Sequence, residues 1–429
     1  MTTRRAVSNE PPIERAALLS LITRGRHRAD PDDILDELAG LAAAAGADVV
    51  LRITQERAAP DPALLFGRGK SEETAEACDR ANATLVIVDN DLSPAQARNL
   101  EHVVRRRVID RTALILDIFA RRARTREGKL QVELAQLQYL MPRLTGAGVE
   151  MSRLGGGIGT RGPGETKLET DRRRIRYRIG GLKRDIADVA RRRGHLRSRR
   201  RRSDVPSVAL VGYTNAGKTT LFNRLTGGTA TASNALFVTL DPLMRRVKLP
   251  DARQILLSDT VGFIDRLPHQ LIAAFQATLE EVAAADLLLH VIDTAAGDRE
   301  RRINAVRSVL MEVGASHVPV LDVYNKIDRV SRAEIDRLRH EHPDAAFVSA
   351  LQGSGRSELL DLMSARVSMD ASRMRFEFDQ RREHDRRIVA DLYRHARVVS
   401  HVTDEHRMSI EADVPKRLVD RFSRSQVPA

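Results

Sequence analysis

The chain has 429 residues, 42% of them hydrophobic, which is enough for packed cores and excludes global disorder. Lysine and arginine outnumber aspartate and glutamate by 71 to 58, and the resulting net charge of +13 favours a polyanionic partner. Tryptophan is absent and aromatic residues make up 3% of the chain, so base stacking is excluded as the main mode of nucleic-acid binding.

The composition also bears on location. A single cysteine, Cys78, excludes an internal disulfide and fits a reducing compartment. The first twelve residues are polar and show no signal peptide, and no apolar run is long enough to span a bilayer. We therefore expect a cytoplasmic protein without a membrane span, and we take it to be a monomer.

After a flexible N-terminus (residues 1–14), residues 15–126 are expected to form a small α/β domain. Apolar runs at 16–22, 49–53 and 84–88 have the character of strands, and a helical pattern follows the first of them. Alternation of this kind predicts a mostly parallel sheet. The segment Gly67-Arg68-Gly69-Lys70 resembles half a phosphate loop. It lacks the full spacing and a preceding strand, which favours a turn that caps the next helix.

Residues 127–202 are expected to form an antiparallel helical hairpin. One apolar seam lies at Leu130, Leu134, Leu137 and Met141, and a second consists of Leu168, Ile175, Ile179, Leu182, Ile186 and Val189. Between them lies a glycine-rich loop, residues 155–164. A flexible linker is one interpretation of this loop. Because it joins two halves of one hairpin, we favour a projecting probe at the tip.

The second helix of this hairpin is strongly basic. Its arginines exceed the nearby carboxylates that could pair with them, so a stripe of positive charge is expected. An RNA backbone is the favoured partner, ahead of an anionic membrane surface or an acidic protein patch. The predicted RNA-contacting residues are Arg153, Gly157, Thr160, Arg161, Arg172, Arg173 and Arg174.

The segment Gly212–Thr219 fits the spacing G-x-x-x-x-G-K-[ST], and it lies between an apolar strand and a helical pattern. This order predicts a phosphate cradle, in which Lys218 reaches the β- and γ-phosphates and the Thr219 hydroxyl binds Mg²⁺. The predicted binding residues of this loop are Gly212, Tyr213, Thr214, Asn215, Ala216, Gly217, Lys218, Thr219 and Thr220.

Three further segments follow apolar strands in order. Asp259-Thr260-Val261-Gly262 predicts a Mg²⁺ ligand in Asp259, acting through water, and a γ-phosphate contact from the Gly262 N–H. Asn325-Lys326-Ile327-Asp328 predicts guanine recognition, because Asp328 can accept from N1–H and N2–H₂ of guanine but not of adenine. Ser349-Ala350 would add a main-chain contact to the base. GTP and GDP are therefore the expected ligands.

A mobile loop should close on the phosphates. Phe237, Val238 and Thr239 are the candidates, and Thr239 is expected to bind Mg²⁺, although Thr229 and Thr231 compete for this assignment. Lys218, Thr239 and Gly262 are the predicted catalytic residues. Phe263 stands where many GTPases place a water-orienting glutamine. Slow hydrolysis is therefore expected in isolation. We predict that a partner, the ribosome, remodels the switch loops and positions the attacking water; the alternative is that another side chain substitutes without any partner.

Three segments give the chain a family resemblance. Residues 108–139, the glycine-rich 155–174 and Asp259–Ile264 together resemble the HflX family of ribosome-associated GTPases, over about residues 15–368. The resemblance implies a large-subunit-binding GTPase that hydrolyses GTP to GDP and phosphate with Mg²⁺. It also implies splitting of stalled or hibernating ribosomes, often under heat or antibiotic stress. The hydrophobic residue at Phe263 is a trait of that family.

The predicted architecture is therefore an α/β domain with a hairpin, a central GTPase domain (203–368) with a mixed, mostly parallel sheet, and a small C-terminal α/β domain (369–429). The C-terminal part is either a packing appendage or a ribosomal contact. The expected partner is the large ribosomal subunit with its rRNA. The alternative function is a GTP-controlled RNA-binding or assembly factor of that subunit without splitting activity.

Overall fold

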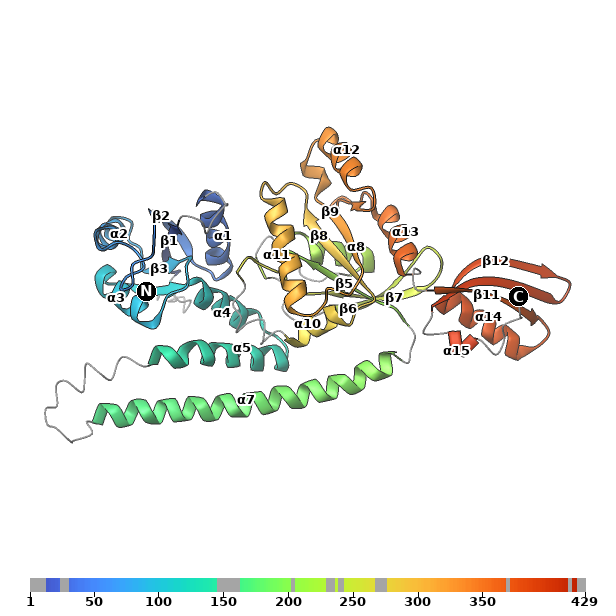
Figure 1. Ribbon diagram of the computed structural model, residues 1–429, viewed down its shortest axis with the longest axis horizontal. Coiled ribbons are helices and arrows are strands. Elements are labelled where there is room, and N and C mark those ends of the chain that lie inside the picture. Colours follow the sequence, from blue (N-terminus) through green and yellow to red (C-terminus); the bar gives the residue numbers. More distant parts are fainter. Residues whose placement is uncertain are drawn as a thin grey trace, which may run out of the picture. The chain divides into compact units, whose positions relative to one another are not determined.

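The computed structural model describes residues 13–23, 31–144, 163–201, 205–228, 236–237, 243–266, 276–367, 371–415 and 419–422 (Figure 1). The chain divides into two compact units. The first comprises residues up to Arg184 and a short segment that ends at Phe237, and the second holds most of the remainder. Over the described ranges, no helix combines the length and the apolar composition needed to cross a bilayer. The predicted α/β fold class is confirmed.

The first unit contains a four-stranded parallel sheet in the order β2-β1-β3-β4. Its strands are β1 (Arg15–Thr23), β2 (Asp48–Arg57), β3 (Leu85–Val88) and β4 (Arg107–Asp110). The helices between and after them are α1 (Pro31–Ala44), α2 (Arg68–Arg80), α3 (Pro94–Val104) and α4 (Arg111–Arg122). Gly67 is the N-cap residue of α2, so this segment starts a helix, as the turn interpretation predicted.

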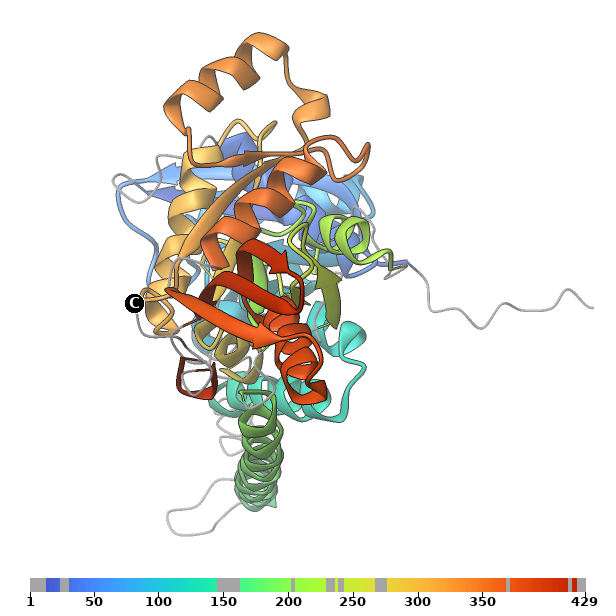
Figure 2. The same cartoon turned by 90° about the vertical axis from the view of Figure 1, so that its right-hand side faces the viewer.

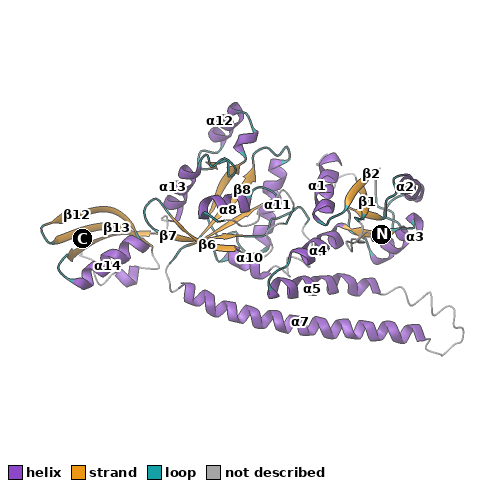
Figure 3. Ribbon diagram, turned by 180° about the vertical axis from the view of Figure 1, so that it is seen from behind, coloured by secondary structure: helices purple, strands orange, loops and turns teal. Residues whose placement is uncertain are grey.

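The helical hairpin consists of α5 (Arg126–Leu140), a 3₁₀ turn η1 (Met141–Leu144) and α7 (Pro163–Arg201). Figures 1 and 3 show α5 and α7 side by side, and the Arg178 guanidinium donates to both Glu133 carboxylate oxygens at 2.7 and 2.8 Å. On α5 the most deeply buried side chains include Val132 and Ala135, whereas Leu130, Leu134 and Leu137 of the predicted seam are half-buried. The helix buries a second stripe because it also packs on α4.

The second unit contains a six-stranded sheet in the order β10-β9-β8-β5-β7-β6, parallel except for β6. Its strands are β5 (Ser207–Gly212), β6 (Leu243–Lys248), β7 (Gln254–Asp259), β8 (Leu287–Asp293), β9 (Val320–Asn325) and β10 (Ala346–Phe347). Its helices are α8 (Lys218–Thr226), α10 (Gln276–Ala283), α11 (Arg299–Glu312), the 3₁₀ turn η2 (Ile327–Arg329), α12 (Arg332–Glu341) and α13 (Arg356–Val367).

Helices cover both faces of this sheet. Phe222 of α8 and Met363 of α13 join one buried core, and Ile303 of α11 and Leu338 of α12 join another. The sandwiched strands β5 and β8 are buried almost throughout, as expected for parallel strands between helix layers. Because these strands are parallel, their carboxyl ends meet at one edge of the sheet, where the predicted motifs lie.

The C-terminal part forms a three-stranded antiparallel sheet in the order β11-β13-β12, with α14 against one face (Figure 2). Its elements are β11 (Ala371–Asp379), α14 (Glu383–His395), β12 (Arg397–Asp404), β13 (Arg407–Pro415) and α15 (Val419–Phe422). Phe376, Leu392 and Ile410 are buried in its core. The small C-terminal α/β domain expected from the sequence is thereby confirmed.

Candidate functional site

The glycine loop connects the end of β5 to the start of α8. Gly212 and Gly217 both adopt positive φ angles, of +151° and +95°. A Cβ atom on Gly212 would lie 2.3 Å from the carbonyl oxygen of Val291, and one on Gly217 would lie 2.2 Å from Nδ2 of Asn325. Neither position has room for a side chain, so the motif glycines are required by close backbone approach as well as by conformation.

Lys218 is the first residue of α8 and is buried. Its Nζ donates to the carbonyl oxygens of Gly212 at 3.0 Å and Tyr213 at 2.8 Å, so the ammonium lies over the loop itself. The pKa of Lys218 is lowered to about 8, chiefly by burial; the carboxylate of Asp259 opposes the shift, and the charge of Lys326 adds to it. The loop thus holds a cation whose charge is only weakly stabilised by its own surroundings.

Two oxygen donors meet beside this lysine. The Thr219 hydroxyl donates to Oδ2 of Asp259 at 2.8 Å, and Asp259 is buried at the end of β7. A hydroxyl and a carboxylate are hard oxygen ligands of the type that Mg²⁺ prefers. Two of the three residues predicted to hold the metal, Thr219 and Asp259, are therefore adjacent, and their chemistry fits Mg²⁺.

The segment after β7 is joined to the glycine loop by main-chain hydrogen bonds. The Phe263 N–H donates to the Gly212 carbonyl at 3.0 Å, and the Thr214 N–H donates to the Phe263 carbonyl at 2.7 Å. The Tyr213 hydroxyl accepts from the N–H of Asp265 at 2.9 Å. Gly262 lies between these contacts, so the predicted γ-phosphate sensor borders the predicted phosphate cradle.

Asn325 connects three of the predicted segments. It is buried, its Nδ2 donates to the Ala216 carbonyl at 2.8 Å, and its Oδ1 accepts from the Ala350 N–H at 3.0 Å. Both ends of its amide are thus used by the protein. Asn325 therefore ties the phosphate loop to the base end of the site, and the second hydrogen of its Nδ2 leaves the predicted nucleotide contact open.

The carboxylate of Asp328 is exposed, and its Oδ1 accepts from the Ser349 hydroxyl at 2.5 Å. Lys326, two residues earlier, has its Nζ 2.7 Å from Oδ2 of Asp293 at the end of β8. These side chains come from the ends of neighbouring strands β8, β9 and β10. The remaining carboxylate oxygen of Asp328 leaves it able to accept from a ligand.

The other predicted site residues lie in the first unit or outside the described residues. Phe237 is buried, with its ring centroid 4.6 Å from that of Phe119 inside the first unit. Val238 and Thr239 lie outside the described residues, as do Arg153, Gly157, Thr160 and Arg161 and the rest of the predicted probe loop. On α7, Arg172 is half-buried, Arg173 is exposed, and Arg174 is exposed with its Nη1 3.9 Å from Asp171.

The anchoring of the loop after β7 has no counterpart in the sequence motifs. Arg301 of α11 donates to Oδ2 of Asp265 at 2.7 Å, and the guanidinium of Arg302 lies 5.1 Å from the ring centre of Tyr213. Tyr213 and Asp265 are 52 residues apart. The sequence does show a tyrosine, Tyr213, within the glycine loop. No rule of residue spacing, however, predicts that its hydroxyl accepts a hydrogen bond from Asp265.

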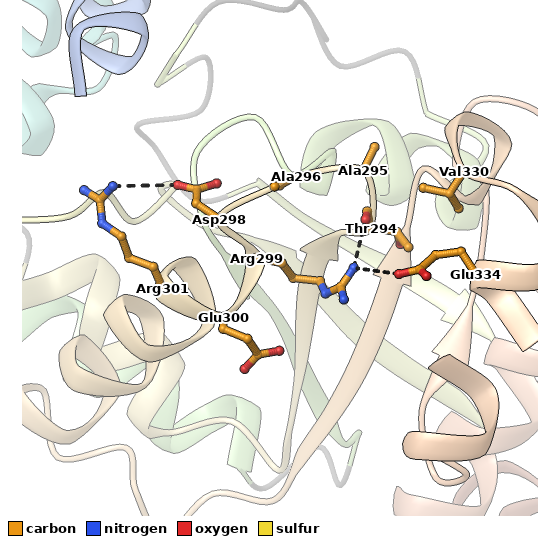
Figure 4. A pocket seen from close by; sticks show the side chains of 10 residues that line it. Thr294, Ala295, Ala296, Asp298, Arg299, Glu300, Arg301, Val330 and Glu334 are labelled. Atoms are coloured by element: carbon orange, nitrogen blue, oxygen red, sulfur yellow. Dashed lines mark hydrogen bonds and ion pairs between the residues drawn. The ribbon is translucent and has the colours of Figure 1, made fainter. Parts of the chain in front are cut away.

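A separate pocket of about 350 Å³ opens beyond the end of β8 (Figure 4). Its arginines face carboxylates within the pocket: Arg299 lies 3.8 Å from Glu334, and Arg301 lies 3.8 Å from Asp298. None of the residues predicted to bind the nucleotide lines it. Arg301 is also paired with Asp265, which lies outside the pocket, so both of these arginines are already held by carboxylates of the protein.

Comparison with known proteins places these segments in families. Residues 32–120 match a family described as the GTP-binding GTPase N-terminal domain, and residues 122–200 match the GTP-binding GTPase middle region. Residues 207–326 match the family described as 50S ribosome-binding GTPase. A solved GTP-binding protein from Sulfolobus solfataricus, in complex with GDP, is 25% identical, with 83% of this chain and 99% of that chain covered and a TM-score of 0.43.

Curated relatives cover most of the chain. GTPase HflX of Caldanaerobacter subterraneus subsp. tengcongensis is 43% identical over 95% of this chain and 93% of its own length. GTPase HflX of Escherichia coli is 50% identical over 78% of this chain and 79% of its own. The resemblance carried by the glycine-rich segments is thereby confirmed, and with the phosphate-loop geometry it identifies the enzyme class. The chain belongs to the HflX family of GTPases.

Proposed function

We propose that this GTPase binds the large ribosomal subunit and separates stalled or hibernating 70S ribosomes into subunits. The observation that carries the proposal is the exposed basic face of α7, where Arg173, Arg174 and Arg176 project from the helix that packs on α5. Surface arginines of this density suit an RNA backbone, because each phosphate contact releases a condensed counterion. A cytoplasmic protein that associates with ribosomes, and acts as a monomer, fits this role.

We assign rRNA contact and nucleotide binding to the segments whose boundaries the sequence predicts. We assign rRNA contact to the α/β domain (15–126) and the hairpin (127–202), with the probe residues Arg153, Gly157, Thr160 and Arg161 at its tip. We assign nucleotide binding to residues 203–368 and treat residues 369–429 as a separate small domain. Nucleotide state would change the segment after β7 and the loop around Thr239, and through them the hold on RNA.

Within the nucleotide site, the loop N–H groups and Lys218 would bind the phosphates, and the Gly262 N–H would contact the γ-phosphate. Thr219, Asp259 and Thr239 would hold Mg²⁺, which when bound neutralises phosphate charge. Asp328 would read the guanine edge, supported by Ser349 and by the Ala350 main chain. Hydrolysis of GTP would then reset the factor for another round.

Sucrose-gradient sedimentation of purified 70S ribosomes tests this proposal. With the chain and a non-hydrolysable GTP analogue, the 70S peak should convert to free subunits. Lys218→Ala, which removes the predicted phosphate contact, should leave the 70S peak intact and serves as the matched control. Binding to precursors of the large subunit without conversion of 70S would instead support the assembly-factor alternative and refute splitting.

A further inference from the structure

Thr214, the third residue of the glycine loop, holds a polar atom that the surrounding protein does not use. Its side chain is 3% exposed, and its Oγ1 is buried without a hydrogen-bond partner among the residues that the structure describes. A buried hydroxyl in a native structure is nearly always hydrogen-bonded, so this one requires an explanation. A valine would fill the same space without the polar atom.

Main-chain hydrogen bonds hold Thr214 against the segment after β7. The Thr214 N–H donates to the Phe263 carbonyl at 2.7 Å, and Phe263 in turn donates to Gly212. A Cβ atom built on Gly262 would lie 2.9 Å from Cγ2 of Thr214 and 3.1 Å from Nζ of Lys218. The Thr214 side chain, through its Cγ2, and the Lys218 ammonium therefore both border Gly262. The latter two are the groups predicted to contact the γ-phosphate, so Thr214 belongs to the γ-phosphate end of the loop.

This end of the site lacks the usual polar side chain. Phe263 follows Gly262, is 1% exposed, and has no group that can donate or accept a hydrogen bond. A threonine hydroxyl has one donor and two acceptor lone pairs. It can donate to a γ-phosphate oxygen and at the same time accept from a water molecule, which are the two contacts that orient a nucleophile against phosphorus.

We propose that the Thr214 hydroxyl orients the attacking water against the γ-phosphate, in the place that Phe263 cannot fill. The water oxygen forms the new bond to the γ-phosphorus, the bridging oxygen leaves with GDP and the electron pair, and the water proton passes to the phosphate product. Thr214 keeps its own proton throughout. The proposal rests on the GTPase activity of the family and is independent of ribosome splitting.

The test compares the full-length parent with Thr214→Val, Thr214→Ala and Thr214→Ser in single-turnover GTP hydrolysis at saturating GTP. Thr214→Val keeps the shape and removes the hydroxyl, and the rate should fall about tenfold or more, since loss of one oriented polar contact commonly costs at least that. Thr214→Ala should fall similarly, and Thr214→Ser should stay within about threefold of the parent.

Nucleotide affinity separates this role from a structural one. The affinity for GDP should be the same in all four proteins. The affinity for a non-hydrolysable GTP analogue should fall several-fold in Thr214→Val and Thr214→Ala, and it should not fall in Thr214→Ser. Hydrolysis by Thr214→Ala at the parental rate would overturn the proposal even if Thr214→Val failed to fold. An equal loss in Thr214→Ser would overturn it as well, because the hydroxyl would then not be the group that matters.

Discussion

At the scale of single residues, the choice of base depends on the carboxylate of Asp328. Asp328→Asn places an amide donor where guanine presents donors at N1 and N2, so GDP affinity should fall by about 100-fold or more. Xanthine carries a carbonyl at C2 that can accept from the new amide, so xanthosine diphosphate should gain affinity. Titration with fluorescent nucleotides measures both effects.

Asp336→Asn is the matched control for this exchange, because Asp336 is exposed on α12 and takes no part in the predicted site. It should bind GDP as the parent does. An Asp328→Asn protein that binds GDP with parental affinity would show that the base is read by another group.

The charge state of Lys218 makes nucleotide binding depend on pH. Burial lowers its pKa to about 8, so at pH 8.5 most of the amine is neutral in the free protein. Bound phosphate favours the ammonium and raises this pKa, so binding takes up protons and the affinity falls as the pH rises above 8. Calorimetric titration of GDP at pH 8.5 in buffers of different ionisation enthalpy should detect the uptake. Lys218→Arg, always charged, should take up none; equal uptake by both would assign the proton elsewhere.

At the scale of elements, packing and not the surface ion pair should hold the hairpin together. Leu182 of α7 is fully buried, and Leu182→Ala should lower the free energy of unfolding by about 2–5 kcal/mol. The side chains of Arg178 and Glu133 are 54% and 40% exposed, so Arg178→Ala should cost less than about 1 kcal/mol despite its two short hydrogen bonds. Denaturant titration of the intact chain compares the two, and a larger loss for Arg178→Ala would contradict this ranking.

Which elements could be predicted follows from how they are buried. The strands β3 and β5 are short, continuous apolar runs, and such runs predict strands that are buried in a parallel sheet. The edge strands β6 and β12 expose most of their residues, so they carry almost no hydrophobic period. Their conformation is set by pairing with β7 and β13, which a local pattern does not report.

The same reasoning separates the two kinds of contact in the site. The meeting of Thr219 with Asp259 was expected, because both follow strands whose carboxyl ends share an edge. The tie from Asn325 to Ala216 spans 109 residues and uses an amide that the motif assigns to the ligand. The Thr214 hydroxyl stands out because it is buried without a hydrogen-bond partner in the described structure. Only the three-dimensional structure shows this, because the sequence does not report burial or hydrogen bonds.

At the scale of the whole molecule, we expect binding to the ribosome to depend on the positive charge of one surface and not on the total net charge of +13. Arg173, Arg174 and Arg176 are exposed on α7, and changing all three to Gln should weaken binding to isolated 50S subunits. If each arginine contacts a phosphate, the slope of log affinity against log salt concentration should become less steep by about 2–3. Binding measured by sedimentation across a salt series gives this slope.

The control removes the same charge elsewhere. Arg332, Arg356 and Arg381 are exposed outside the hairpin, and their triple change to Gln also lowers the net charge by three. That protein should keep the parental slope, because counterion release counts contacts made and not charge carried. Both triple variants should bind GDP as the parent does, since neither touches the glycine loop. Equal losses of 50S affinity in the two variants would mean that the ribosome responds to overall charge, and the assignment of α7 as the RNA-binding face would be wrong.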